Sequence, residues 1–258
     1  MKSTKTIVLI HGLFVNNTSW AQWKTYFESQ GYKVYTPANP GHEGTPAQLR
    51  TNTHPDLTQT GFEDVVMNIV KLIDTLPEKP IVVGHSLAGL VVQKLIEMDK
   101  AVAGVSIDGA PPKNVLAPWA TVKIVLPVVN FFKGNQAYLG SREWYHRAFF
   151  NNYTKEESDL LFDKIAVPES RKIARDTLLT SFAKIDFKKP HNPLLFIGGE
   201  KDNIFSSSFT KQIAGSYKDS SSTTDFKEFA GRSHFIAGEK GWEEVAEYVL
   251  NWIKKVNA

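Results

Sequence analysis

Ser86 has the sequence context of a catalytic nucleophile. Ile81 to Val83 form a short apolar, β-branched run that predicts a buried strand, and apolar residues after Ser86 recur with helical spacing. A serine between a strand and a helix is held in a strained turn that exposes its hydroxyl, and this turn needs small neighbours. Gly84 precedes Ser86 by two residues, and Ala88 stands where the usual G-x-S-x-G pattern has its second glycine. The pattern predicts a nucleophilic serine, and an ordinary turn residue is the alternative.

A serine hydroxyl becomes a strong nucleophile only when a base takes its proton and a third group orients that base. His234 follows the last predicted strand and is the candidate base, while Asp202 follows the preceding predicted strand and is the candidate acid. Asp108 also ends a predicted strand and is the alternative acid, and Asp202 could instead cap the helix that follows it. The order Ser86, Asp202, His234, with each residue beyond a strand end, predicts a catalytic triad.

Backbone N–H groups must hold the negative oxygen that forms when Ser86 attacks a carbonyl. Leu87 supplies one of them, because it follows the nucleophile and begins a helix whose dipole favours negative charge. The second is expected from the loop after the first strand, at Leu13, with Phe14 beside it in the substrate site.

The elements that position these residues alternate between short apolar runs and amphipathic stretches. Strands are predicted at 6–10, 32–35, 81–85, 102–107, 193–199 and 225–229, and helices at 62–76, 87–98 and 242–253. This alternation predicts an α/β fold in which helices cover both faces of a mostly parallel sheet. Sites in such folds lie at the carboxyl ends of the strands, where the triad candidates fall.

The alternation stops after Pro111 and Pro112. Residues 113–189 contain clustered aromatic residues and helix-like stretches without an obvious strand. We therefore expect residues 1–112 and 190–258 to form the core, and 113–189 to form a helical cap insertion. An apolar cap over a serine makes a pocket lined by hydrophobic side chains. The candidates for substrate contact, which could equally pack the core of the cap, are Trp119, Trp144, Tyr145 and Phe149.

The composition is that of an ordinary soluble globular protein, with 42% hydrophobic and 22% charged residues in a chain of 258. A net charge of +3 is too small to indicate nucleic-acid binding. The absence of cysteine excludes disulfides and a thiol nucleophile, and no histidines stand at metal-ligand spacing, so we expect no metal and no cofactor. The apolar run at 7–10 is shorter than that of a signal peptide, which predicts a cytoplasmic protein. We expect a monomer or a homodimer.

No stretch approaches the roughly 20 apolar residues of a membrane span, so we expect no stable membrane insertion. The run from Val122 to Phe132 is nevertheless apolar apart from Lys123 and Asn130, and Lys133 follows it directly. It can be interpreted either as the core of the cap or as a surface that contacts lipid.

Taken together, these features resemble the α/β-hydrolase superfamily, in which the triad has the same serine, acid, histidine order. The matching residues are His11-Gly12 after the first strand, Pro40-Gly41-His42-Glu43 after the second, the Ser86 turn, Gly-Glu-Lys-Asp at 199–202 and Arg-Ser-His at 232–234. The resemblance spans the chain except for 113–189, which is similar to the variable cap of the family. It implies an α/β-hydrolase fold with about six strands, similar to the compact esterase, hydroxynitrile lyase and non-haem haloperoxidase-like branches.

The resemblance implies hydrolysis of carboxylic esters through an acyl-enzyme on Ser86, and the apolar cap favours small to medium apolar esters as substrates. The same triad could instead serve a lyase, a C–C hydrolase, or a perhydrolase or haloperoxidase-like activity. A member of the fold that binds apolar ligands without catalysis is a further alternative. Dehalogenase and epoxide-hydrolase relatives carry an aspartate at the turn, so Ser86 argues against both.

Overall fold

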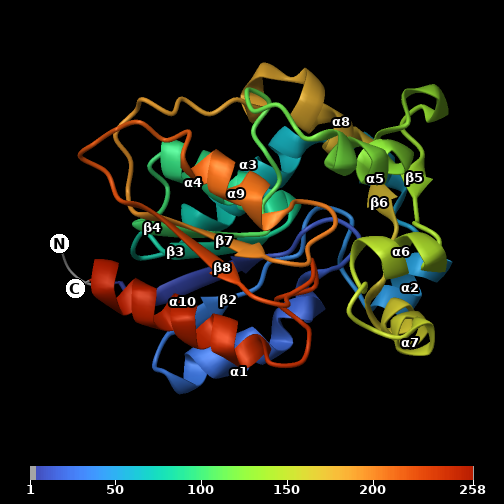
Figure 1. Cartoon of the computed structure of the whole chain (residues 1–258), viewed down its shortest axis with the longest axis horizontal. Helices are drawn as coiled ribbons and strands as arrows, with labels where there is room; N and C mark the ends of the chain where they lie inside the picture. Colours follow the sequence, from blue (N-terminus) through green and yellow to red (C-terminus); the bar gives the residue numbers. More distant parts are fainter. Residues whose placement is uncertain (1–3, 258) are drawn as a thin grey trace.

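A six-stranded parallel sheet forms the centre of the computed structural model, which describes residues 4–257 (Figure 1). Its strands lie in the order β2-β1-β3-β4-β7-β8, and every neighbouring pair is parallel. The strands are β1 (Thr6–Ile10), β2 (Lys33–Tyr35), β3 (Ile81–His85), β4 (Ala103–Ile107), β7 (Leu194–Gly199) and β8 (Thr224–Phe229). The predicted strands differ from these by no more than a residue at either end, and the expected α/β architecture is confirmed.

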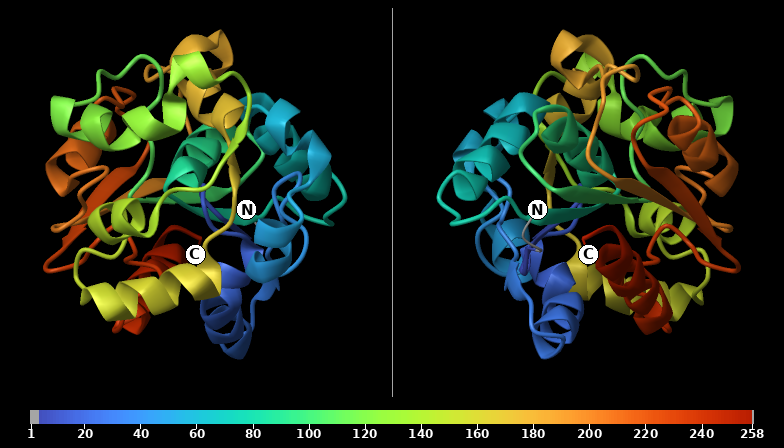
Figure 2. Two further views of the ribbon diagram at one scale, coloured as in Figure 1. Left: turned by 90° about the vertical axis from the view of Figure 1, so that its right-hand side faces the viewer. Right: turned by 90° about the vertical axis from the view of Figure 1, so that its left-hand side faces the viewer.

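Helices cover both faces of the sheet, as Figures 1 and 2 show. One face carries α3 (Phe62–Ile73), α4 (Leu87–Glu97) and α9 (Ser207–Ala214), and the other carries α1 (Ala21–Ser29) and α10 (Trp242–Val256). Residues of a strand point alternately to the two faces. In β1, Val8 and Ile10 join the core under α3 and α4, whereas Ile7 and Leu9 join the core under α1 and α10. All four are fully buried, which explains why this strand is apolar throughout.

Residues 113–189 leave the sheet after β4 and return to it before β7. They contain α5 (Trp119–Val129), α6 (Arg142–Ala148), α7 (Lys155–Ile165) and α8 (Arg171–Leu179). They also contain β5 (Ala137–Tyr138) and β6 (Glu169–Ser170), which pair antiparallel although no strand was expected here. Strands this short leave no alternating pattern in the sequence. Figure 1 shows these elements grouped at one end of the sheet, near α2 (Pro46–Thr51).

The remaining regular elements are short 3-10 helices at Asn17–Trp20, Pro55–Gln59, Phe131–Lys133 and Ser181–Ala183. Among the helices of residues 4–257, none has both the length and the apolar character that a bilayer crossing requires.

Candidate active site

Ser86 occupies the turn between β3 and α4 in a strained backbone conformation. Its φ is 58° and its ψ is −123°, a region that residues other than glycine rarely adopt. The turn is held by its own peptide groups: the N–H of Ser86 donates to the carbonyl of Ile107, and its carbonyl accepts from the N–H of Ala110, both at 2.9 Å. These bonds tie the nucleophile candidate to the end of the neighbouring strand β4.

The small residues around Ser86 have separate structural roles. A Cβ at Gly84 would lie 2.2 Å from the carbonyl oxygen of Ala88, so only glycine fits where the strand passes beneath the helix. A Cβ at Gly89 would lie 2.4 Å from the Oγ of Ser106 and 2.5 Å from the Cα of Gly109. Position 88 therefore tolerates alanine, because the close contact between α4 and the chain after β4 is made one residue later, at Gly89.

Ser86, His234 and Asp202 form a hydrogen-bonded chain in the interior. The hydroxyl of Ser86 lies 3.0 Å from His234 Nε2, and His234 Nδ1 lies 2.7 Å from Asp202 Oδ2. The other oxygen of Asp202 accepts from the backbone N–H groups of Ile204 and Phe205, at 2.6 and 3.0 Å. With Nδ1–H donating to the carboxylate, Nε2 of His234 is left to accept the proton of Ser86.

Asp108, the alternative acid, lies beside this chain but takes no direct part in it. Its Oδ1 accepts from the N–H of Gly199 at 2.7 Å, and the residue is fully buried. Burial and the nearby carboxylate of Asp202 raise the pKa of Asp108 well above its usual value. Its protonated form is thereby favoured. Asp202, and not Asp108, forms the hydrogen bond with the imidazole of His234.

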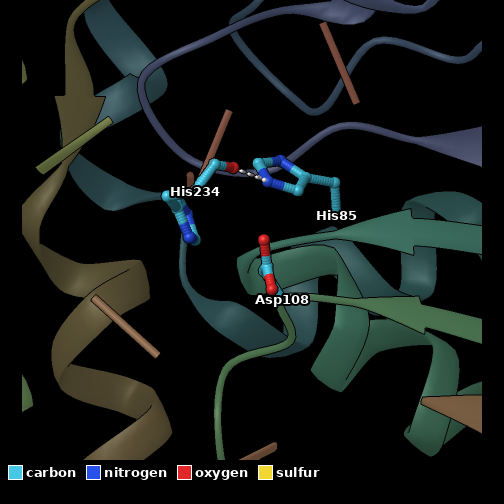
Figure 3. A group of neighbouring side chains, drawn as sticks. All are labelled: His85, Asp108 and His234. Carbon is cyan, nitrogen blue, oxygen red and sulfur yellow. Dashed lines mark hydrogen bonds between the residues drawn. The ribbon is translucent and has the colours of Figure 1, made fainter. Parts of the chain in front are cut away.

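His85 supports the backbone of the candidate base. Its Nε2 lies 2.7 Å from the carbonyl oxygen of His234, so Nε2 carries the proton and donates it (Figure 3). Burial, with a smaller effect of His234, lowers the pKa of His85 to about 3, which keeps the ring neutral. A metal site needs several nitrogen or oxygen ligands close together. Among residues 4–257, one group of histidine and acidic side chains meets this condition: potential ligand atoms of His85, Asp108 and His234 lie within 4.8 Å of one another. Both ring nitrogens of His234 are already bonded within the triad, so we assign this group to support of the triad.

The loop after β1 packs directly against the Ser86 turn. A Cβ at Gly12 would lie 2.7 Å from the carbonyl oxygen of His85 and 2.8 Å from Cβ of Ser86, so glycine permits this approach. Leu13 follows and lines the same cavity as Ser86 and Leu87. Leu87 begins α4, so its N–H is among those that have no acceptor within the helix.

Phe14 stands in the left-handed region, with a φ of 67°, and is held there by the 113–189 segment. Its N–H donates to Glu169 Oε2 at 3.3 Å. Its carbonyl accepts from the hydroxyl of Tyr145 at 3.0 Å and from the N–H of Val167 at 3.1 Å. The backbone N–H and carbonyl groups of Phe14 are therefore both held by residues distant in the sequence. Phe14 directly follows the expected oxyanion donor Leu13.

Glu169 is a site residue that the sequence did not single out. It comes from the two-residue strand β6, and its Oε2 lies 3.1 Å from Nε2 of His42, with both side chains 1% exposed. Burial lowers the pKa of His42, but the charge and hydrogen bonding of Glu169, together with the Pro40 carbonyl and the charge of Glu43, outweigh this effect, so the net pKa is raised. No local pattern marks Glu169, because its partners belong to other parts of the chain.

The hydroxyl of Ser86 opens into an apolar cavity of about 100 Å³ between the sheet and the 113–189 segment. Leu13, Leu87 and Phe14 line it from the core. Val125 and its neighbours on α5 and Leu178 on α8 form the opposite wall.

The aromatic candidates of the 113–189 segment divide into two groups. Trp144 and Phe149 line the cavity, and the ring of Phe149 lies edge-on to His234 with centroids 5.0 Å apart. Trp119 and Tyr145 do not line it, contrary to expectation. Trp119 is 67% exposed on the outer face of α5, while Tyr145 is fully buried and its hydroxyl donates to the carbonyl of Phe14. Helical spacing identifies a face of apolar residues but does not tell which side of the helix meets the cavity.

The sheet, the strained serine turn and the serine-histidine-aspartate chain are those of an α/β-hydrolase. The model of the alpha/beta hydrolase family matches residues 7–248, and the chain belongs to this family. A curated relative, the pimeloyl-[acyl-carrier protein] methyl ester esterase of Aromatoleum aromaticum, is 33% identical over 120 residues. This match covers 44% of the chain and 42% of that relative, so the chain spans less than half of its length.

Two solved structures show the same fold. Tomato methylketone synthase I, in complex with 2-tridecanone, has a TM-score of 0.72 and 19% identity, with 98% of this chain and 99% of that chain covered. A methylesterase from Arabidopsis has a TM-score of 0.69 and 17% identity, with 96% and 98% covered. At these identities the likeness establishes the fold alone. Family membership together with the esterase relative supports hydrolase activity.

Proposed function

We propose that the protein is a serine carboxylic-ester hydrolase that cleaves small to medium apolar esters through an acyl-enzyme on Ser86. The observation that carries this proposal is the continuous hydrogen-bonded chain from Ser86 Oγ through His234 to Asp202, placed at the floor of an apolar cavity. A base and an orienting carboxylate are what a serine needs to become nucleophilic.

In the proposed mechanism, His234 Nε2 removes the hydroxyl proton as Ser86 Oγ bonds to the acyl carbon. The carbonyl oxygen becomes negative and is held by the N–H groups of Leu13 and Leu87. The imidazolium, stabilised by Asp202, then returns its proton to the departing alcohol. Water repeats these steps on the acyl-enzyme, releasing the carboxylic acid and restoring Ser86.

The cavity walls support an apolar acyl or alcohol group. Apart from Ser86 and two threonines, Thr121 and Thr177, its lining side chains are aliphatic or aromatic. The curated relative is named as a methyl ester esterase, which supports ester cleavage by this chain. We draw nothing from its name about the acid part of the substrate. Without charged lining residues, an ionised group deep in this cavity would lack a partner.

Labelling with a fluorophosphonate probe tests the proposal. We expect the unmodified protein to form a covalent adduct at Ser86 and to hydrolyse p-nitrophenyl esters, and the Ser86→Ala variant to lose both properties with unchanged thermal unfolding. Removal of a triad member lowers kcat by several powers of ten. Ester turnover that persists in Ser86→Ala contradicts the proposal. A folded protein that binds apolar ligands yet resists the probe supports instead a non-catalytic role or base-only lyase chemistry.

A further inference from the structure

The outer surface of the 113–189 segment concentrates the exposed apolar side chains of the molecule. Residues 4–257 have nine large hydrophobic side chains that are exposed, and seven of them lie on α5, α8 or the residues adjoining α5. The side chain of Phe132 is 99% exposed and that of Phe131 is 55% exposed. Groups of exposed apolar residues are uncommon on soluble proteins and indicate a contact surface. We call this group the apolar face; its members are Leu116, Trp119, Leu126, Phe131, Phe132, Leu178 and Leu179.

The apolar face is the outer side of the helices that enclose the substrate cavity. On α5, Val125 lines the cavity while Leu126, the next residue, is 55% exposed. On α8, Leu178 both lines the cavity and is 45% exposed. Figure 2 shows α5 and α8 side by side at one end of the molecule. An amphipathic molecule held at this face would therefore lie beside the wall of the cavity, where Leu178 reaches both the cavity and the surface.

These helices are fixed in place, so the exposure is not the result of a loosely attached element. The guanidinium group of Arg171 donates to the carbonyl of Val128 at 2.8 Å, and Arg175 Nε donates to that of Val129 at 2.7 Å. Both arginines thus bind the carboxyl end of α5, where a helix favours positive charge. The solvent-facing side of a surface helix is normally polar, so the apolar side chains on the outer side of this firmly held helix require a separate explanation.

The charge around the α5 part of the apolar face is of one sign, whereas α8 carries Asp176 beside Arg171, Lys172 and Arg175. Residues 109–142 contain Lys113, Lys123, Lys133 and Arg142 and no acidic residue. Lys123 lies over the ring of Trp119, with its Nζ 5.7 Å from the ring centroid. Aromatic and aliphatic side chains flanked by lysines are typical of helices that rest in the interface of an anionic lipid layer.

We propose that the apolar face docks on an anionic lipid surface and that the enzyme takes its amphiphilic substrates from there. Phe131 and Phe132 enter the boundary between head groups and acyl chains, while Lys123 and Lys133 contact the head-group phosphates. The attachment is peripheral, since the penetrating side chains come from the ends of short helices. The docking is independent of the proposed ester hydrolysis, because binding to lipid does not require turnover, whereas the uptake of substrates from the lipid rests on that proposed function.

Vesicle flotation of the Ser86→Ala variant of the full chain tests the docking separately from catalysis. We expect binding to phosphatidylglycerol vesicles, weaker binding to phosphatidylcholine vesicles, and a decline as salt is raised. Adding Phe131→Ser with Phe132→Ser should lower the partition coefficient by at least about tenfold, since each buried aromatic side chain contributes substantially. Adding Lys123→Glu with Lys133→Glu should lower it by about tenfold or more, and only on the anionic vesicles.

The matched control exchanges the two exposed apolar residues outside the apolar face, Met67→Ser with Leu160→Ser, and should leave the partition unchanged. The same surface substitutions, made in the protein that retains Ser86, should leave the rate of hydrolysis of a dissolved acetyl ester unchanged. This result would establish that the variants are folded. Absence of binding to phosphatidylglycerol vesicles, or an equal loss in the control, overturns the inference. So does sedimentation evidence that the apolar face joins two copies of the chain, with monomers formed on Phe131→Ser and Phe132→Ser.

Discussion

Glu169 and His42 form an ion pair in the interior, with Oε2 and Nε2 3.1 Å apart and both side chains 1% exposed. Glu169 comes from the 113–189 segment, His42 from the loop after β2, and Glu169 also accepts the N–H of Phe14. Glu169 therefore connects the segment above the cavity both to the loop after β2 and to the loop that carries the expected oxyanion donor Leu13. Because Phe14 has a positive φ, this loop depends on such contacts to keep its shape.

Replacing Glu169→Gln should lower kcat for dissolved p-nitrophenyl esters by about tenfold, with a KM changed by less than about twofold. The reason is that oxyanion donors act mainly in the transition state, and a displaced loop weakens them without removing them. Steady-state kinetics on esters of one acyl length measure the effect. Glu156→Gln, the same exchange on the exposed surface of α7, is the control and should leave both kcat and KM unchanged. A change confined to KM would show that Glu169 does not position the donor.

The Glu169–His42 pair should make the free energy of unfolding depend on pH in a defined direction. The pKa of His42 is raised in the folded protein above its usual value of 6.5. Its charged form therefore stabilises the fold fully below about pH 6.5, and this contribution is lost as the pH rises through the raised pKa. Chemical denaturation should show Glu169→Gln to be less stable by about 1–3 kcal/mol at low pH. The difference from the unmodified protein should shrink at higher pH; a difference that is constant or grows with pH contradicts the assignment.

Asparagine at each of the two buried aspartates should separate the triad acid from its neighbour. Asp202→Asn is expected to lower kcat by about 10⁴-fold, because the imidazole then loses the partner that sets its tautomer. Asp108→Asn should retain activity within about tenfold, since Asp108 binds Gly199 and not His234. Parallel measurement of kcat in the two variants checks this, with thermal unfolding to establish that both are folded. A greater loss in Asp108→Asn would reverse the assignment.

Val125→Phe should shorten the range of acyl chains that the enzyme accepts. Val125 lines the cavity from α5, so a larger side chain takes space that the acyl group would fill. We expect the kcat/KM for hexanoyl esters to fall at least about tenfold, as one or two methylene contacts are lost, while acetyl esters are little affected. Leu126→Phe, on the exposed side of the same helix, is the matched control. An equal loss on acetyl and hexanoyl esters would indicate a damaged fold instead of a narrower cavity.

Much of the framework could be predicted from the sequence because its causes are local. The apolar runs at 6–10 and 81–85 are buried strands, and Gly84 and Ser86 form the strained turn that their spacing predicts. The sequence identifies His234 and Asp202 as candidates because each follows a predicted strand, and parallel strands bring their carboxyl ends to one edge. It does not predict the two-residue strands β5 and β6, because so short a segment has no period to detect.

The sequence alone determined the strands of the central sheet and where the reactive side chains stand along them, because hydrogen bonding and apolar periodicity act over a few residues. Only the tertiary structure placed Asp202, and not Asp108, in hydrogen-bond contact with His234, placed Tyr145 against Phe14 instead of in the cavity, and brought Glu169 to His42. These choices depend on distances between residues far apart in the chain. Such distances are set by how the 113–189 segment packs on the sheet, and no local pattern of residues encodes that packing.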